Sequence, residues 1–449
     1  MAKTYDAVVI GAGPPGEVVA GELADGGMSV AVCERELVGG ECGYWACIPS
    51  KTLLRPGEAI AEARHAPGAR EAVTGKLDSA AAFEWRDFQV SDYDDAGQAK
   101  WLEDKGVRIF RGNARIEGRG KVAVAEETIE TERIVVATGS DPVIPPVEGL
   151  RALEGLWTNR EATGAKEVPE RLIILGGGPV GVEIGQAFAR MGASVAIAEA
   201  EDRVLFKEAE RAGELLGEAL EAEGIELKLG AKATAAERRG DGYALRFEDG
   251  TELRGEKLLV ATGRRARTEG LGLESAGIEP DEKGSVEVDE RLRAGDAVWA
   301  VGDVTGTMLF THLGKYQARV AAANIAGKDT RADYRAIPAA VFTDPQVASV
   351  GVMEGEGIVS ARYDITGGRL STYERPKRSG FVKLAADASR RVLVGAIAVG
   401  PEAGEWLGQL TLAVRAEISL DVLLDTIQPY PTFSESIFNG LRELEPKLA

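Results

Sequence analysis

Two distant segments of the chain repeat one pattern, in which a short apolar strand runs into a glycine-rich turn and then a helix. The strands are residues 7–10 and 172–175, and each helix is followed by a further apolar strand that ends in an acid, Glu34 or Glu199. The glycines of the two turns are Gly11, Gly13 and Gly16 and, in the repeat, Gly176, Gly178 and Gly181. In a βαβ unit such glycines let the backbone approach a pyrophosphate at the helix N-terminus, and the acid can bond a ribose diol. The repeat therefore predicts two dinucleotide sites.

The acid of the second unit bears on the choice of nicotinamide cofactor. Glu199 favours a free ribose 2′-hydroxyl, and so NADH over NADPH. Arg203 follows four residues later. NADP(H) therefore stays as the less favoured alternative.

Three more strand ends carry polar or glycine residues that we expect near the cofactors. Two apolar strands end in the same Ala-Thr-Gly sequence, which places Thr138, Gly139 and Gly263 at strand ends. A third strand, residues 297–301, ends in Gly-Asp, and Asp303 can bond a sugar-like hydroxyl chain. A long helix is expected from residue 311 to about 325, and its N-terminus could stabilise negative charge on a reduced ring. His312, in its first turn, can reach that ring or serve in capping and packing.

Residues 39–51 hold two of the three cysteines, Cys42 and Cys47, with four residues between them. Gly43 permits the irregular backbone that would bring the two Cα atoms within the ~4.4–6.8 Å of a disulfide. Pro49 suits the first position of a following helix, so Cys47 should lie just before the helix N-terminus, where its thiolate is stabilised. The stretch therefore predicts redox chemistry. The third cysteine, Cys33, lies within a strand and is interpreted as a small buried hydrophobe.

Two other readings of the cysteine pair remain open. Cys-x4-Cys is also a metal spacing, but the other candidate ligands, Cys33, His65 and His312, are scattered along the chain, so no metal site is predicted. A structural disulfide is disfavoured because nothing marks the chain as secreted. His65 is expected on the surface, near the end of a helix that begins at about residue 50.

Composition bears on partners and compartment. The 449 residues carry a net charge of −19, which argues against binding nucleic acid or an anionic membrane. No apolar run approaches the length of a membrane span. The first strand begins within a few residues of Met1, which leaves no room for a signal peptide. Three cysteines fit a reducing compartment, so we expect a cytoplasmic protein.

Together these motifs resemble the flavin-dependent pyridine nucleotide–disulfide oxidoreductases, and the resemblance covers essentially the whole chain. It implies an α/β fold with two Rossmann-like dinucleotide-binding domains and a C-terminal α+β dimerisation domain. The implied boundaries are 1–148 for the first part of the FAD-binding domain, 149–265 for the NAD(P)-binding domain, 266–335 for the FAD-binding and central part, and 336–449 for the dimerisation domain. It also implies FAD at the first glycine turn and Asp303, NAD(H) at the second turn, and a homodimer whose subunits share the active site.

The resemblance also implies roles for individual side chains. Cys47 matches the cysteine nearest the flavin, and Cys42 matches the interchange thiol that attacks a small-molecule acceptor. Lys51 matches the lysine near flavin N5, and Glu183 its carboxylate partner. Hydride would pass from nicotinamide to flavin, and electrons from flavin through the disulfide to the acceptor.

One segment departs from the family pattern. Disulfide-reducing members carry His-x-His-Pro-Thr before a Glu, whereas this chain has Tyr430-Pro431-Thr432 followed by Glu435. A tyrosine, with a pKa of about 10, is a poor base at neutral pH. The leading hypothesis is an NADH-oxidising flavoenzyme with a working Cys42–Cys47 disulfide. The alternatives are flavin-only electron transfer, as a transhydrogenase or a quinone or dye reductase, and a redox sensor or structural FAD-binding partner with negligible turnover.

Overall fold

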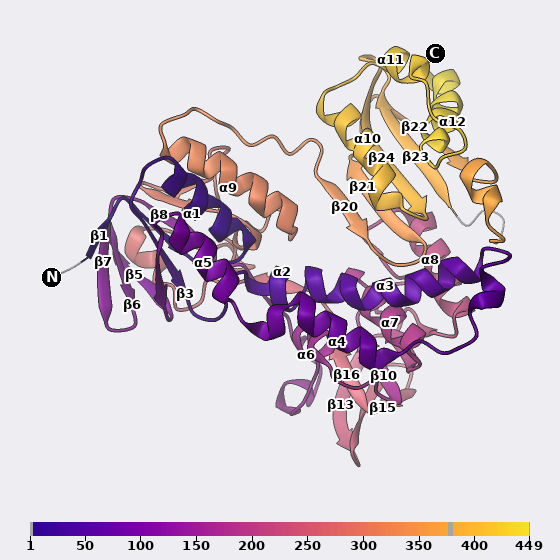
Figure 1. Ribbon diagram of the computed structural model, residues 1–449, viewed down its shortest axis with the longest axis horizontal. Helices are drawn as coiled ribbons and strands as arrows, with labels where there is room; N and C mark the ends of the chain where they lie inside the picture. The colour runs from indigo at the N-terminus through magenta and orange to yellow at the C-terminus, as the bar shows by residue number, and fades with distance from the viewer. Residues whose placement is uncertain (1–2, 376–379, 449) are drawn as a thin grey trace. The chain divides into compact units, whose positions relative to one another are not determined.

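The computed structural model describes residues 3–375 and 380–448 (Figure 1). The chain forms two compact units, and each draws on three separate stretches of sequence. Unit 1 comprises residues 1–50, 84–143 and 263–333, and unit 2 comprises residues 51–83, 144–262 and 334–449.

Unit 1 is built on a six-stranded sheet in the order β18-β19-β8-β2-β3-β4. All neighbouring strands are parallel except the edge pair β18–β19. The strands are β2 (Ala7–Ile10), β3 (Val30–Glu34), β4 (Arg108–Arg111), β8 (Ile134–Val136), β18 (Arg293–Gly295) and β19 (Val298–Ala300). Since β2 and β8 lie at its centre, the first glycine turn leaves the sheet next to the Thr138 strand end.

The two faces of this sheet are covered differently because successive side chains of a strand point to opposite faces. Val9 and its neighbours pack against helices α1 (Pro14–Asp25) and α9 (Thr311–Ile325), which lie side by side in Figure 1, and α5 (Ala96–Asp104) contributes to the same core. On the other face, Val8 and Ile10 pack against a small sheet in the order β1-β7-β6-β5. Its strands are β1 (Lys3–Tyr5), β5 (Ala114–Gly118), β6 (Lys121–Val124) and β7 (Glu127–Thr131).

Several short elements of unit 1 carry residues that the sequence predicted for the site. A two-stranded ribbon joins β9 (Ser140–Pro142) to β17 (Arg264–Ala266). The cysteine stretch forms the short helix α2 (Gly40–Tyr44) and the start of α3 (Cys47–Arg64), and α4 (Ser79–Gln89) follows later. Helix α3 begins at Cys47 itself and continues through Pro56, so Pro49 is its third residue rather than its first.

One part of unit 2 has the same layered arrangement as unit 1, with a parallel sheet between helices and a small antiparallel sheet. Its parallel sheet has the order β12-β11-β10-β16 and comprises β10 (Arg171–Leu175), β11 (Ser194–Ala198), β12 (Glu226–Lys228) and β16 (Lys257–Val260). One face packs against α7 (Pro179–Met191), α8 (Glu210–Ala222), α6 (Asn159–Gly164) and the buried leucines of α3. The other face packs against the antiparallel strands β13 (Ala233–Arg239), β14 (Gly242–Phe247) and β15 (Glu252–Gly255).

The C-terminal part of unit 2 is an antiparallel sheet in the order β20-β21-β24-β23-β22. Its strands are β20 (Pro338–Val341), β21 (Gln346–Gly351), β22 (Ile358–Asp364), β23 (Phe381–Asp387) and β24 (Val392–Gly400). Helices α10 (Ala403–Arg415), α11 (Leu420–Asp425) and α12 (Glu435–Leu444) cover one face. The opposite face shares a core with the parallel sheet through Val347, Phe381 and Val399.

The predicted fold class, α/β with two dinucleotide-binding units and a C-terminal α+β part, is confirmed. Helix α11 was not expected, and the surface position expected for His65 is wrong in part, because its Nδ1 atom is buried. Burial, followed by the nearby Arg375 guanidinium, lowers the pKa of His65.

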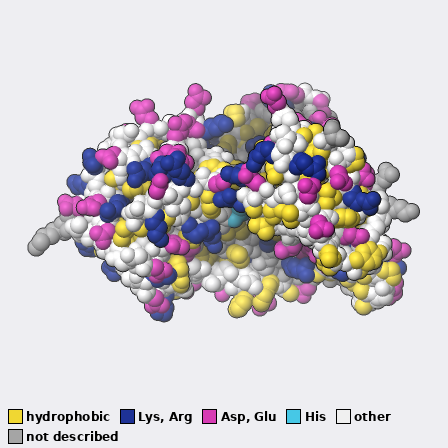
Figure 2. Space-filling view, turned by 90° about the horizontal axis from the view of Figure 1, so that it is seen from above, with side chains coloured by type: hydrophobic (Ala, Val, Ile, Leu, Met, Phe, Trp, Pro, Cys, Tyr) yellow, Lys and Arg dark blue, Asp and Glu magenta, His cyan; other side chains and the backbone are white. Residues whose placement is uncertain are grey.

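Figure 2 shows acidic and basic side chains interspersed over the visible face rather than gathered by sign. No helix within residues 3–375 and 380–448 is long and apolar enough to span a membrane.

Candidate active site

The first glycine turn is shaped by two backbone contacts that exclude a side chain. Gly11 has φ 101°, and a Cβ there would lie 2.4 Å from the carbonyl oxygen of Ala137. A Cβ on Gly16 would lie 2.0 Å from the carbonyl oxygen of Gly11. Gly13 is different, because a Cβ there would meet nothing within 4 Å. The turn is therefore closed on the sheet side and open where the N-terminus of α1 presents its unpaired amides.

The second turn has the same geometry. Gly176 has φ 116°, and a Cβ there would lie 2.5 Å from the carbonyl oxygen of Ala261. A Cβ on Gly181 would lie 2.0 Å from the carbonyl oxygen of Gly176. Gly178, the residue before α7, again has open space at its Cβ position. An open cradle in front of a helix N-terminus fits a pyrophosphate in both units.

The two glutamates that follow the glycine turns accept the same pattern of backbone hydrogen bonds. Glu34 is buried and accepts hydrogen bonds from the amides of Ala12 (2.7 Å) and Glu36 (2.8 Å). Glu199 is equally buried and accepts from the amides of Gly177 (2.7 Å) and Glu201 (3.1 Å). Each carboxylate thus bridges its glycine turn and the end of its strand, where a ribose diol would be recognised. Arg203 bonds to Asp202 and to the carbonyl of Phe206.

Matched glycine variants test the second turn. In Gly181→Ala the new methyl group overlaps backbone, so we expect a loss of stability of about 1–3 kcal/mol, measured as a lower Tm. In Gly178→Ala the methyl group enters open space at φ −74°, so we expect an unchanged Tm. Because that space is the expected pyrophosphate cradle, the Kd for NADH of Gly178→Ala should rise at least about tenfold, measured by titration. Wild-type NADH binding by Gly178→Ala would contradict this assignment.

Asp303 lies at the end of β19, next to the ribbon of β9 and β17. Its Oδ2 accepts a hydrogen bond from Ser140 Oγ at 2.6 Å, and Arg264 donates to the same Oγ at 2.8 Å. Burial raises the pKa of Asp303, while the Ser140 bond and the Arg264 charge oppose that rise. Arg264 also lies 3.8 Å from the carboxylate of Glu41. Sequence reasoning missed Ser140, Arg264 and Glu41 because their pairing joins residues more than 100 positions apart.

Thr138, Gly139 and Gly263 immediately precede the two strands of this ribbon. Thr138 Oγ1 donates to the carbonyl of Arg267 at 2.7 Å, and the Gly139 carbonyl accepts from the Arg267 amide. Gly263 precedes β17 with φ 127°. These contacts connect the end of β8 to β17 and hold Ser140 beside Asp303.

The cysteine stretch packs directly on the first glycine turn. Gly40 has φ 58°, and a Cβ there would lie 2.7 Å from the Cα of Gly13. The Cys42 thiol hydrogen-bonds to Cys47, and Cys47 Sγ lies 3.4 Å from Thr311 Oγ1 on α9. The bond to Cys47 and burial raise the pKa of the Cys42 thiol, whereas Thr311 and the Lys315 ammonium lower it. Two adjacent thiols therefore lie beside a dinucleotide turn.

Cys33 takes no part in this cluster. It is 2% exposed within β3, and burial raises the pKa of its thiol to about 12. Its interpretation as a small buried hydrophobe is confirmed.

Lys51 and Glu183 form an ion pair within unit 2. Lys51 Nζ lies 2.7 Å from Glu183 Oε2, and Glu183 Oε1 accepts the Phe342 amide at 2.9 Å. The lysine ammonium also lies 4.8 Å from the centre of the Phe342 ring. Glu183 is buried on α7 while Lys51 remains partly exposed on α3.

The remaining predicted residues lie at the surface or near it. Tyr430 is 76% exposed, and Glu435, at the start of α12, donates its amide to Thr432 Oγ1 at 3.3 Å. A Cβ on Gly368 would lie 2.8 Å from Glu435 Oε2, so the Glu435 carboxylate lies close to the backbone of Gly368. His312 is exposed and stacks on Phe310, with ring centres 5.1 Å apart.

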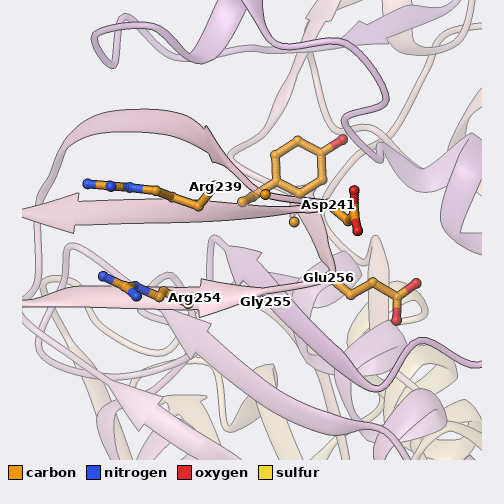
Figure 3. Close-up of a pocket in the computed structure, with 8 residues that line it drawn as sticks. Arg239, Asp241, Arg254, Gly255 and Glu256 are labelled. Carbon is orange, nitrogen blue, oxygen red and sulfur yellow. The ribbon is translucent and has the colours of Figure 1, made fainter.

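A surface pocket of about 560 Å³ lies elsewhere in unit 2, where β13 turns into β14 (Figure 3). Arg239 and Arg254 line it, but each forms an ion pair with a glutamate, Glu237 and Glu252 respectively. It contains none of the residues predicted for catalysis or cofactor binding.

Two family profiles match the chain. The profile described as "Pyridine nucleotide-disulphide oxidoreductase" matches residues 5–328, and its dimerisation domain matches residues 337–439. The chain belongs to the pyridine nucleotide–disulfide oxidoreductases, an enzyme family that uses FAD and NAD(P)H. The dimerisation domain supports formation of a homodimer.

Individual relatives match over nearly the full length. The chain is 35% identical to a dihydrolipoyl dehydrogenase of Thermus scotoductus over 455 residues, covering 98% of each chain. It is 32% identical to a mercuric reductase of Staphylococcus aureus, covering 96% of this chain and 81% of that one. Among solved structures, the HOCl-induced flavoprotein disulfide reductase RclA of Escherichia coli superposes with a TM-score of 0.85 at 27% identity, covering 98% and 99% of the chains. The predicted family and cofactors, FAD and NAD(H), are confirmed.

Proposed function

We propose that this enzyme oxidises NADH through FAD and passes the electrons through a Cys42–Cys47 redox disulfide to a disulfide-type acceptor. The observation that carries the proposal is the thiol cluster itself. Cys42 hydrogen-bonds to Cys47, and their loop packs on Gly13 of the first dinucleotide turn. A half-buried dithiol beside a flavin-type dinucleotide site is suited to two-electron exchange.

The residue roles follow from the chemistry of each contact. FAD, when bound, supplies the two-electron step that connects NAD(P)H to the dithiol. The first turn binds its pyrophosphate, Glu34 its ribose, and Asp303 its hydroxyl chain. Thr311, 3.4 Å from Cys47 Sγ, can donate a hydrogen bond that favours a Cys47 thiolate, and the first turn of α9 adds the positive end of its dipole. Cys42 is the sulfur that attacks the acceptor.

The second unit supplies the electron donor's site and a charged support. The residues that would hold NADH are Gly176, Gly178, Gly181 and Glu199. Glu183 holds the Lys51 ammonium group in place near the start of α3. We assign residues 1–148 and 266–335 to the FAD-binding and central part, 149–265 to the NAD(P)-binding domain and 336–449 to the dimerisation domain. In the homodimer each active site would draw Tyr430 and Glu435 from the other subunit.

The names of the relatives support disulfide chemistry without choosing an acceptor. Dihydrolipoyl dehydrogenase and the disulfide reductase RclA both act, by name, on dithiols or disulfides. We place the reaction in the cytoplasm, where a reducing environment keeps such a dithiol cycling. The acceptor is a small molecule, and neither nucleic acid nor membrane is part of the site.

A second candidate is favoured by Tyr430. This side chain is 76% exposed and stands where disulfide-reducing members carry a histidine base, and the chain's two histidines, His65 and His312, lie in other segments. Flavin-only transfer to quinones, dyes or a second nicotinamide needs no such base. Under that alternative the cysteines would not be essential.

An anaerobic NADH titration of the purified flavoprotein separates the two candidates. We expect a long-wavelength charge-transfer absorbance band from the FAD-loaded enzyme, because a Cys47 thiolate would supply electron density to the oxidised flavin. Cys47→Ser should lose the band while its flavin is still bleached by NADH. Bleaching of the wild-type flavin without such a band would favour the flavin-only alternative.

A further inference from the structure

The backbone around Asp303 is fixed, whereas its carboxylate is oriented by another element. The Gly302 amide donates to Oε1 of Gln317, a fully buried residue of α9, at 2.7 Å, and the Asp303 carbonyl accepts the Gly306 amide at 3.0 Å. Among the residues that the structure describes, the carboxylate has one hydrogen-bond partner, because Ser140 Oγ donates to Oδ2 at 2.6 Å. The other oxygen, Oδ1, therefore remains available to a hydroxyl group of a ligand.

The ribbon of β9 and β17 places Arg264 and Ser140 on one face. Arg264 pairs with Pro142 and Ala266 pairs with Ser140, and alternate residues of a strand share a face. The Arg264 guanidinium reaches Ser140 twice, since Nε donates to Oγ at 2.8 Å and Nη2 donates to the carbonyl at 2.7 Å. Ser140 is buried, so its hydroxyl is held between the arginine and Asp303.

The donors and acceptors fix the direction of these hydrogen bonds. A guanidinium group has donors and no acceptor, so Ser140 Oγ accepts from Arg264. The single hydroxyl proton of Ser140 is then free for Asp303, and Oδ2 is the acceptor. Both bonds are directed toward the carboxylate, so together they favour its ionised form and one orientation.

The charges that face Asp303 come from three places in unit 1. Burial raises the pKa of Asp303, and the Glu41 carboxylate of α2 adds to that rise. The Ser140 hydrogen bond and the charges of Arg264 and Arg267 oppose it. Of the two arginines, Arg264 is the one whose guanidinium bonds to the Ser140 hydroxyl. Arg264 is therefore the cation that is connected to the carboxylate through hydrogen bonds.

We propose that Arg264 and Ser140 are positioning residues for FAD, which act through Asp303 by holding its carboxylate ionised and in the orientation that accepts a hydroxyl of the cofactor. This proposal rests on the assignment of Asp303 to the FAD hydroxyl chain made above. It adds the residues that prepare that carboxylate, and neither of them needs to contact the cofactor for this role.

Release of FAD from the holoenzyme measures this role without turnover. Holoenzyme is diluted at pH 5 to pH 8, and the fluorescence of released FAD gives its Kd. At pH 7 we expect Ser140→Ala and Arg264→Met each to raise the Kd at least about tenfold, because each removes a bond that supports a charged acceptor.

The pH dependence separates positioning from a merely structural role. Protonated Asp303 accepts a hydroxyl poorly, so FAD binding should weaken as the pH falls. Loss of the Arg264 cation makes Asp303 easier to protonate, so the ratio of the Kd at pH 5 to the Kd at pH 7 should be larger in Arg264→Met than in the wild type. Arg264→Lys keeps the charge and should restore the wild-type ratio, although it cannot form both bonds of the guanidinium.

The next residue of β17 provides the matched control. Arg265 is exposed, and the alternation of the strand places it on the opposite face of the ribbon, where it donates to the Lys283 carbonyl at 3.3 Å. Arg265→Met should therefore match the wild type in both Kd and pH dependence. Equal effects in Arg265→Met and Arg264→Met would overturn the proposal.

Asp303→Asn distinguishes failure of the proposal from failure of the assignment on which it rests. If Asp303→Asn releases FAD like the wild type, the assignment of Asp303 is wrong and the positioning proposal is overturned with it. If Asp303→Asn releases FAD readily but Ser140→Ala and Arg264→Met do not, only the positioning proposal is overturned. Because Ser140→Ala removes a single oxygen atom, it decides the test even if Arg264→Met unfolds.

Discussion

Cys42→Ser should abolish turnover of disulfide acceptors, by at least about a thousandfold, while NADH still reduces the flavin at a rate close to that of the wild type. A serine hydroxyl cannot form the anion that attacks a disulfide at neutral pH, and loss of a nucleophile commonly has an effect of this size. Nothing in NADH binding or flavin reduction requires Cys42, so the first half-reaction should survive. The measurements are stopped-flow flavin reduction and steady-state turnover with lipoamide, glutathione disulfide and cystine.

The third cysteine provides the control. Cys33→Ala removes a thiol that is buried in β3 and belongs to no site contact, so its turnover should match the wild type. The same panel should include a quinone and a dye, which the flavin can reduce directly. If Cys42→Ser changes turnover with none of these acceptors, the dithiol has no catalytic role.

The second large effect is expected on stability, at the ion pair of α3 and α7. Glu183→Ala leaves Lys51 and the amide of Phe342 without the carboxylate that both now contact. Breaking a buried pair from one side costs about 3–5 kcal/mol, and the lower end applies because Lys51 keeps contact with water. We therefore expect the free energy of unfolding to fall by about 3 kcal/mol, measured by urea denaturation of the FAD-loaded enzyme. In Glu183→Gln, which keeps an acceptor for the Phe342 amide, the free energy of unfolding should fall by less.

An exposed ion pair gives the comparison. Lys100 and Asp104 pair at 2.7 Å on the surface of α5. Since surface pairs contribute little to stability, Asp104→Ala should leave the urea midpoint unchanged. If Glu183→Ala and Asp104→Ala lowered the free energy of unfolding equally, the Glu183 contacts would not stabilise the fold.

What the sequence alone determined were the features encoded in short stretches. Each glycine turn, with its strand, helix and terminal acid, occupies about thirty residues, and local backbone constraints dictate its shape. The cysteine stretch could be recognised in the same way, from the spacing of its two cysteines and from its glycines. The family resemblance added the pairing of Lys51 with Glu183, which no local pattern indicates.

The tertiary structure alone decided which distant residues meet around these motifs. Thr311 and Cys47 are 264 positions apart, and Ser140 and Asp303 are 163 apart. Neither the hydrophobic periodicity nor the spacing of motifs in the sequence indicates such contacts. They depend on how α9 packs on α1 and how β9 pairs with β17. The same packing brings the Lys315 ammonium close enough to lower the pKa of the Cys42 thiol. The motifs could be recognised from the sequence because their backbone constraints are local, whereas the contacts around them arise from packing between segments that are remote in sequence.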